Sequence, residues 1–184
     1  LNRASGQYAV VSGGLFNAAS GAVSTVSGGI LNCAGGAYSW AGGNRAAVRP
    51  GSESGFGGDV CAVAPSPNAL GDDGTFVWSD SSGGRFVSTG SNQFLVRAQG
   101  GMAINTNTPT AGAALTVNGN VDVATTGSLS FGSQTRQMLN LWGPAGYGIG
   151  VQSDRLYFRS FSGFSWFQGG VHSDTADNAG TGGT

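Results

Sequence analysis

A glycine-punctuated pattern that recurs every 15 residues constrains the fold of this chain more than any other feature. Asn2, Asn17 and Asn32 mark equivalent positions of three consecutive copies within residues 1–47. A unit of this length holds two strands of roughly five residues and two tight turns, which is one turn of a β-solenoid stacked about 4.8 Å from the next. The glycine density excludes a helix. The repeat therefore predicts an all-β fold that begins with a short parallel β-roll.

Short alternating segments between the glycines define two faces of the expected strands. The smaller side chains are Ala9/Val11, Ser24/Val26 and Ser39/Ala41, and the larger ones are Tyr8/Val10, Val23/Thr25 and Tyr38/Trp40. We expect the small set to fill a thin interior and the large set to face neighbouring chains or solvent. The three repeat asparagines fit stacked turn positions, where each side chain bonds its own backbone and the copies above and below.

The repeat resembles one known family. Residues Ser12 to Val26 read Ser-Gly-Gly-x-x-Asn-x-Ala-Ser-Gly-x-x-Ser-x-Val, which resembles the head repeat of trimeric autotransporter adhesins, the YadA-like left-handed parallel β-roll. Related repeats occur in secreted fibre proteins and phage tail fibres. The resemblance implies a homotrimer with three rolls side by side that attaches to a surface or matrix. Large apolar side chains on a thin coil also favour a trimer, because packing three copies around an axis buries them.

The period ends after residue 47, and residues 48–70 are predicted to form an inserted loop that contains three of the five prolines. Cys33 and Cys61 are the only cysteines. An even count in a chain of extracellular character favours a disulfide that ties this loop to the third repeat, and the alternative is two buried thiols.

Three further segments complete the expected organisation. Residues 71–112 resemble the segment that follows such repeats in bacterial secreted fibre proteins, where the chains interweave around the three-fold axis. Residues 113–133 look like the linker strands of trimeric fibres. Residues 134–184 are predicted to form a small aromatic-rich β-module. The expected fold class is thus a β-roll followed by interwoven trimeric β-fibre modules, in a chain that we expect to be a fragment of a longer protein.

The inserted loop is a candidate partner-binding surface, with a solvated insertion as the alternative, and the aromatic-rich module is our candidate ligand surface. Aromatic rings exposed in a groove bind sugars by stacking, and arginines bond hydroxyls or carboxylates of a glycan. The candidate residues are Trp142, Tyr147, Arg155, Tyr157, Arg159 and Trp166. The alternative is that these rings form the core of the trimer.

Composition argues against several classes of function. The chain has eight arginines, no lysine and a net charge of −1, so we expect no nucleic-acid partner. No apolar run approaches the roughly 20 residues of a membrane span. Two cysteines and a distant His172 do not form a metal site, and His172, Ser173 and Asp174 in succession do not make a triad. We therefore expect no cofactor, no metal and no catalysis.

These observations predict a structural and adhesive fibre segment, extracellular or on a bacterial cell surface, whose outer-membrane anchor would lie in regions outside this chain. Its expected partners are two further copies of itself and a glycan, a host or prey surface or a matrix protein. The alternative within binding proteins is the receptor-binding segment of a phage tail fibre. The alternative from another class is a β-solenoid glycan hydrolase or lyase, which needs paired acids in a cleft.

Overall fold

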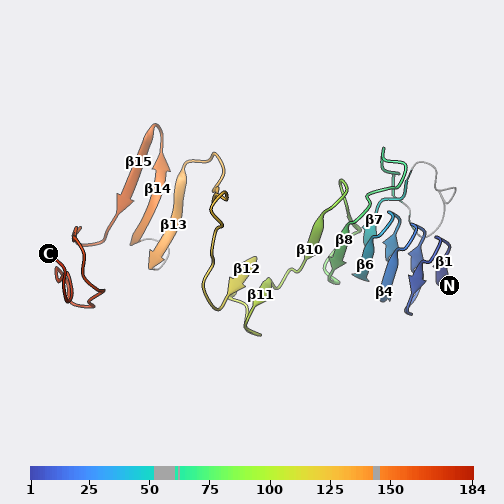
Figure 1. The fold of residues 1–184 in the computed structure, drawn as a ribbon, viewed down its shortest axis with the longest axis horizontal. Helices are drawn as coiled ribbons and strands as arrows, with labels where there is room; N and C mark the ends of the chain where they lie inside the picture. The colour runs from blue at the N-terminus through green and yellow to red at the C-terminus, as the bar shows by residue number, and fades with distance from the viewer. Residues whose placement is uncertain (52–60, 62, 143–145) are drawn as a thin grey trace. The chain divides into compact units, whose positions relative to one another are not determined.

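The computed structural model describes residues 1–51, 61, 63–142 and 146–184, and these residues form an all-β protein. The chain divides into two compact units, Leu1–Val121 and Asp122–Thr184 (Figure 1). The first unit contains the solenoid, and the second contains a small antiparallel sheet.

Two five-stranded parallel sheets build the solenoid. The first has the order β1 (Arg3–Ala4), β3 (Ala18–Ala19), β5 (Cys33–Ala34), β7 (Ala46–Val48), β9 (Phe86–Val87). The second has the order β10 (Phe94–Arg97), β8 (Phe76–Ser79), β6 (Trp40–Asn44), β4 (Thr25–Ile30), β2 (Val10–Val11). A further parallel pair, β11 (Met102–Ile104) and β12 (Leu115–Val117), follows. The predicted β-solenoid is confirmed, and it extends over residues 3–117.

The insertion separates two consecutive turns of the same solenoid. Strand β8 pairs in parallel with β6, so that Phe76 lies opposite Trp40 and Val77 opposite Ala41. The chain therefore leaves the coil after β7 and returns to the next position of the same sheet. Residues 52–60 and 62 of the predicted loop lie outside the described part of the chain.

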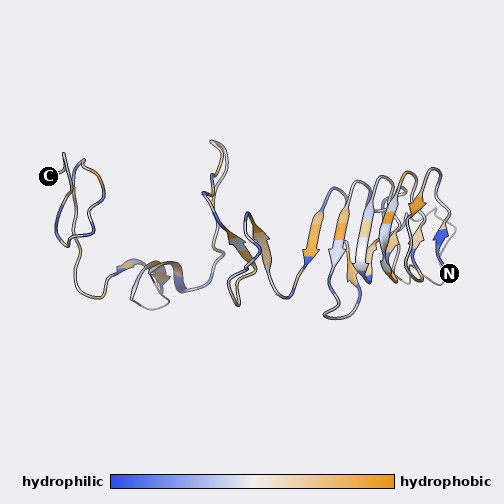
Figure 2. Cartoon of the chain, turned by 90° about the horizontal axis from the view of Figure 1, so that it is seen from below, coloured by the Kyte–Doolittle hydropathy of each residue, from blue (hydrophilic) through white to orange (hydrophobic). Residues whose placement is uncertain are grey.

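The solenoid interior is thin and filled by small side chains, as the alternation predicts. Val26, Ala41 and Val77 are fully buried, and so are the hydroxyl-bearing Ser24 and Ser39. Many of the apolar segments lie on the solenoid strands in Figure 2. Gly6, Gly21 and Gly29 permit this close stacking, since a Cβ atom at these positions would overlap the backbone of the adjacent turn.

The strands of the second sheet begin two residues later than their sequence predicts. Tyr8, Val23 and Tyr38 lie in turns at φ between 55° and 59°, and the strands start at Val10, Thr25 and Trp40. The corner of each turn needs a left-handed residue, and this fold places a non-glycine side chain there. The expectation that Tyr8, Val23 and Tyr38 are strand residues is therefore wrong.

The third repeat is one residue shorter than the others, and a β-bulge accommodates the difference. Val26 pairs with Ala41, but the next pair is Gly29 with Gly43, so that two residues of β4 oppose one residue of β6. The extra residue is absorbed at the glycine corner, and Ile30 again pairs with Asn44. The column of asparagines that follows this corner therefore stays in register.

The second unit contains one antiparallel sheet of three strands. Its order is β13 (Arg136–Trp142), β14 (Tyr147–Gln152) and β15 (Arg155–Arg159). Strand β13 carries two register shifts, between Gln137 and Leu139 and between Asn140 and Trp142. Each shift moves the following side chains to the opposite face of the sheet.

Candidate functional site

The repeat asparagines form a hydrogen-bonded column through the solenoid. Asn17 and Asn32 are fully buried. The Asn32 amide group donates to the carbonyls of Gly28 and Gly43, both at 2.8 Å, and its Oδ1 accepts from the Ala46 N–H at 2.9 Å. The Asn17 side chain repeats these bonds one turn earlier, with Gly13 and Gly29 at 2.9 and 2.8 Å.

Each asparagine also bonds the next one, and this makes the column directional. Asn17 Oδ1 accepts from the backbone N–H of Asn32 at 3.0 Å, and Asn2 Oδ1 accepts from the N–H of Asn17 at 3.1 Å. These contacts satisfy polar groups at corners where the sheets cannot pair them, which a buried corner requires. The residues that the sequence singles out as a turn column thus have a structural role.

An ion pair closes the base of the insertion. Arg49 Nε and Nη2 donate to the two carboxylate oxygens of Asp72 at 2.7 and 3.1 Å, and the Asp72 side chain is almost fully buried. Ser88 Oγ, which comes from the turn after β9, donates to Asp72 at 2.5 Å. The two ends of the insertion also meet through the Asp72 N–H and the Arg49 carbonyl.

The same contacts control the protonation of Asp72. Burial raises the pKa of its carboxyl group, but hydrogen bonds from Arg49, Ser88 and Ser66 and the charge of Arg49 outweigh this effect. The net result is a pKa below the ordinary value of 3.8. Asp72 is therefore ionised at neutral pH and serves as a buried acceptor rather than as an acid.

The predicted disulfide is confirmed. Cys33 of β5 and Cys61 of the insertion are bonded, with their Cα atoms 5.3 Å apart. Both cysteines are buried and pack with Ala18 and Ala47 of the neighbouring strands. The bond therefore fixes one point of the insertion to the third turn of the solenoid.

A row of large side chains follows the outer surface of the second sheet. The parallel register aligns Val10, Thr25, Trp40, Phe76 and Phe94, which we call the aromatic column. The rings of Trp40 and Phe76 stack with centroids 4.3 Å apart, and those of Phe76 and Phe94 with centroids 4.6 Å apart. The terminal ring of Phe94 is 71% exposed. The column thus places three stacked rings on the outer side of the second sheet, with Trp40 and Phe76 partly exposed and Phe94 exposed.

The three-stranded sheet has two chemically different faces. Alternation and the register of β14 place the following seven side chains on one side, which we call the apolar face: Leu139, Trp142, Tyr147, Ile149, Val151, Leu156 and Phe158. The opposite side, the polar face, carries Gln137, Asn140, Gly148, Gly150, Gln152, Arg155, Tyr157 and Arg159. The sheet is therefore amphipathic although it has a single layer.

The candidate ligand residues are divided between these two faces. Arg155, Tyr157 and Arg159 lie together on the polar face, where the Arg159 guanidinium is 5.2 Å from the centroid of the Tyr157 ring. Trp142 and Tyr147 stack on the apolar face with centroids 5.7 Å apart. Trp166 belongs to neither face, because it lies in the exposed segment after β15. The six residues therefore do not form one site.

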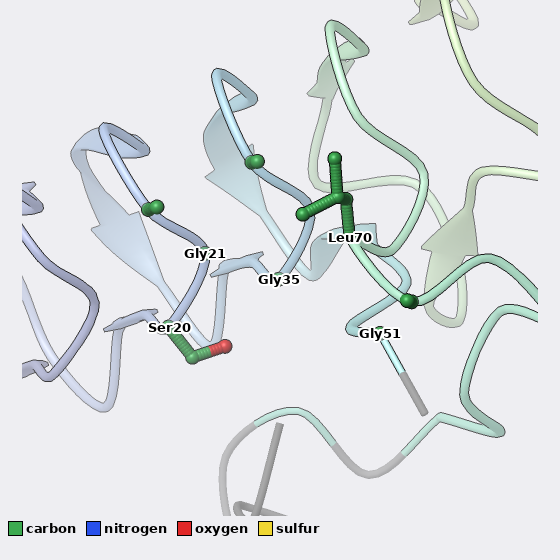
Figure 3. Close-up of a pocket in the computed structure, with 8 residues that line it drawn as sticks. Ser20, Gly21, Gly35, Gly51 and Leu70 are labelled. Carbon is green, nitrogen blue, oxygen red and sulfur yellow. The ribbon is translucent and has the colours of Figure 1, made fainter. Parts of the chain in front are cut away.

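A hollow of about 210 Å³ lies beside the turns after β3 and β5 (Figure 3). Ser20, Gly21 and Gly35 from these turns line it together with Gly51 and Leu70 from the ends of the insertion. Ser20 Oγ is buried without a hydrogen-bond partner in the described part of the chain. The hollow is smaller than the roughly 300 Å³ at which small-molecule sites begin.

Other candidate chemistry is sparse among the described residues. His172 Nε2 and Asp174 Oδ1 are 2.9 Å apart, but both side chains are exposed, and Ser173 Oγ accepts from the Thr175 N–H. Within the described ranges no group of three or more His, Cys, Asp or Glu side chains could bind a metal ion. These ranges also contain no helix that could cross a membrane.

Sequence reasoning missed the Arg49–Asp72 ion pair. Its only sequence signal is that two opposite charges flank the insertion, one on each side.

No protein-family model, curated protein or solved structure matches the chain.

Proposed function

We propose that the chain is a segment of a homotrimeric extracellular fibre of a bacterial surface, which supports the fibre and attaches it to a surface or glycan. The aromatic column carries this proposal. Stacked rings that run along one outer sheet of a thin solenoid form a large apolar patch, and such patches mark association sites. Three copies packed side by side around an axis bury the patch in a closed assembly.

The disulfide supports an extracellular location. Cys33 and Cys61 account for both cysteines of the chain. Disulfides persist in secreted and surface proteins and are rare in reducing compartments. The fibre segment therefore belongs to an oxidising environment.

The polar face of the three-stranded sheet supports attachment. Arg155, Tyr157 and Arg159 offer guanidinium groups and a phenol at one edge of this face. Planar guanidinium groups bond carboxylates and hydroxyls of acidic glycans in a bidentate manner. A trimer presents three such faces, and several weak contacts made together raise the overall affinity through effective concentration.

The oligomeric state provides the first test. Sedimentation or native mass spectrometry of the chain is expected to give about 55 kDa, three times the mass of the 18.3 kDa monomer. The double variant Trp40→Arg/Phe76→Arg places charges in the middle of the aromatic column and is expected to weaken the trimer at least tenfold. Tyr38→Arg is the matched control, because Tyr38 lies in a turn outside the column and Arg45 occupies a similar left-handed position. A stable monomer of the unaltered chain would overturn the proposal.

A glycan array provides the second test. The unaltered chain is expected to bind acidic glycans, and Arg155→Gln/Arg159→Gln is expected to lose this binding at unchanged mass and stability. Arg3→Gln is the control, since Arg3 lies in the first unit on β1. If Arg155→Gln/Arg159→Gln binds acidic glycans as strongly as Arg3→Gln does, another surface makes the attachment.

A further inference from the structure

The apolar face of the three-stranded sheet keeps large exposed side chains among the described residues of the second unit. Trp142, Leu156 and Phe158 are 78%, 66% and 53% exposed. A sheet of three strands is stable in water when one of its faces packs against a further layer. The described residues of the second unit supply no such layer for this face.

The polar face, in contrast, is closed by the side chains of the sheet itself. Gly148 and Gly150 of β14 are buried beneath Gln137 and Tyr157. A Cβ atom at Gly150 would lie 2.5 Å from Tyr157 Oη, so the phenol ring lies directly on the glycine backbone. Gln137 Nε2 also donates to Asn140 Oδ1 at 2.6 Å. Only the apolar face therefore needs a partner.

The composition of the apolar face indicates the chemistry of that partner. It carries no acidic residue and no lysine, and Arg136 at its corner donates to the Phe131 carbonyl. Apart from Arg136 this face offers no charge, so a charged partner surface would lose hydration with little compensation. The partner surface is therefore expected to be apolar.

A second copy of the same face meets this requirement. The aromatic column of the first unit already gives the chain one apolar surface that we assign to self-association. Copies of the chain cover both surfaces at once, whereas a different partner would have to match each of them separately. Trp142, Leu156 and Phe158 are each more than half exposed, so this face offers on the order of several hundred Å² of apolar surface, compared with the roughly 800 Å² per partner of a stable interface.

We propose that the apolar face of β13–β15 packs against the same face of other copies of the chain and forms a second self-association site, separate from the solenoid. The polar face then points outward with Arg155, Tyr157 and Arg159. This inference rests on the proposed trimer and adds to it the surface by which the second unit joins the assembly.

Single cysteines in the full chain test this proposal, because both native cysteines are held in a disulfide. Leu156→Cys places a thiol on the apolar face, and Arg155→Cys places one on the polar face of the same strand. Phe158→Cys is a second apolar-face variant, in case Leu156→Cys misfolds. Maleimide labelling is expected to be at least tenfold slower at Leu156→Cys than at Arg155→Cys. Oxidation is expected to link chains on a non-reducing gel at least fivefold more with the apolar-face variants.

The same variants in the Trp40→Arg/Phe76→Arg background separate the second site from the solenoid. Continued linking of Leu156→Cys in that background supports a self-association site in the second unit. A trimer mass with Leu156→Cys labelled as fast as Arg155→Cys would overturn this inference and leave the proposed function intact. A monomer in which Leu156→Cys is protected would also overturn it, since residues 160–184 would then be the cover. A monomer with fast labelling would overturn both proposals.

Discussion

The solenoid and the three-stranded sheet differ in how they bury their apolar side chains and pair their polar groups. Each inner turn of the solenoid stacks on another turn of the same kind. Its backbone groups, its asparagine and its glycine corner therefore make their contacts within the chain. Within the described residues of the second unit, the three-stranded sheet has no such neighbour. Its polar face is closed by Gln137 and Tyr157, and its apolar face is left open.

This difference shows where each unit is sensitive to change. Substitutions in the solenoid interior and corners, away from the aromatic column, act on contacts within one chain, so the loss of stability that they cause is expected to be independent of protein concentration. We propose that the apolar face of the sheet contacts other chains, so the effect of substitutions there is expected to change with protein concentration. Substitutions at three sites of the solenoid test this difference.

The largest loss of stability is expected for Asn32→Asp. The carboxylate has the same shape as the amide but no donor, so the carbonyls of Gly28 and Gly43 lose their hydrogen bonds and face a buried charge. The free energy of unfolding is expected to fall by about 4 kcal/mol or more, measured by urea denaturation.

Asn2→Asp provides the control for that experiment, because Asn2 lies at the exposed end of the same column and donates to the Gly14 carbonyl alone. Its cost is expected to be about 1 kcal/mol. Equal losses for the two variants, or a loss that depends on protein concentration, would contradict the contrast between the two units.

A smaller and pH-dependent loss is expected for Asp72→Asn. The pKa of Asp72 is lowered in the folded chain, so its ionised form stabilises the fold above the ordinary value of 3.8, and this contribution disappears as pH falls toward the folded pKa. The variant is expected to lose roughly 3 kcal/mol at pH 7, with a smaller difference at pH 3.

The matched variant Asp73→Asn changes a more exposed carboxylate that accepts from Asn68 and Ser91. It is expected to cost about 1 kcal/mol. A difference between Asp72→Asn and the unaltered chain that stays constant from pH 7 to pH 3 would show that the ionised form of Asp72 does not stabilise the insertion.

The smallest effect is expected from a pair of glycine substitutions. A Cβ at Gly21 would overlap the Gly36 carbonyl of the next turn and lie 2.9 Å from the Ala37 nitrogen, whereas a Cβ at Gly13 meets nothing within 4 Å. Gly21→Ala is expected to cost about 2 kcal/mol, and Gly13→Ala to change stability by less than about 0.5 kcal/mol. Thermal unfolding of both variants checks this, and equal midpoints would argue against close backbone stacking.

The sequence predicts the first turns of the solenoid well, because a period of 15 residues brings equivalent side chains into register. Asn17 and Asn32 could be assigned to stacked corners for this reason alone. The continuation of the solenoid after the insertion is harder to recognise from the sequence. Strand β8 reads Phe-Val-Trp-Ser where β6 has Trp-Ala-Gly-Gly, so the repeat signal is lost although the backbone path continues.

The candidate site could be predicted only in part, because its geometry depends on register shifts. Gln137 and Leu139 would share a face under strict alternation, but the shift between them places Gln137 on the polar face and Leu139 on the apolar face. The ion pair of Arg49 and Asp72 is equally hidden, since 23 positions separate its partners and only the return of the insertion brings them together.

The asparagine column has one more consequence, which concerns how such a chain can change over generations. Each turn makes the same hydrogen bonds with the next turn as with the previous one. One 15-residue unit can therefore be duplicated or deleted without creating a new kind of contact between turns. Each duplication lengthens the coil by about 4.8 Å. The insertion after β7 shows that a corner also accepts added chain without interrupting the stack. The number of turns in the coil and the segments inserted at its corners can therefore be inherited as independent traits.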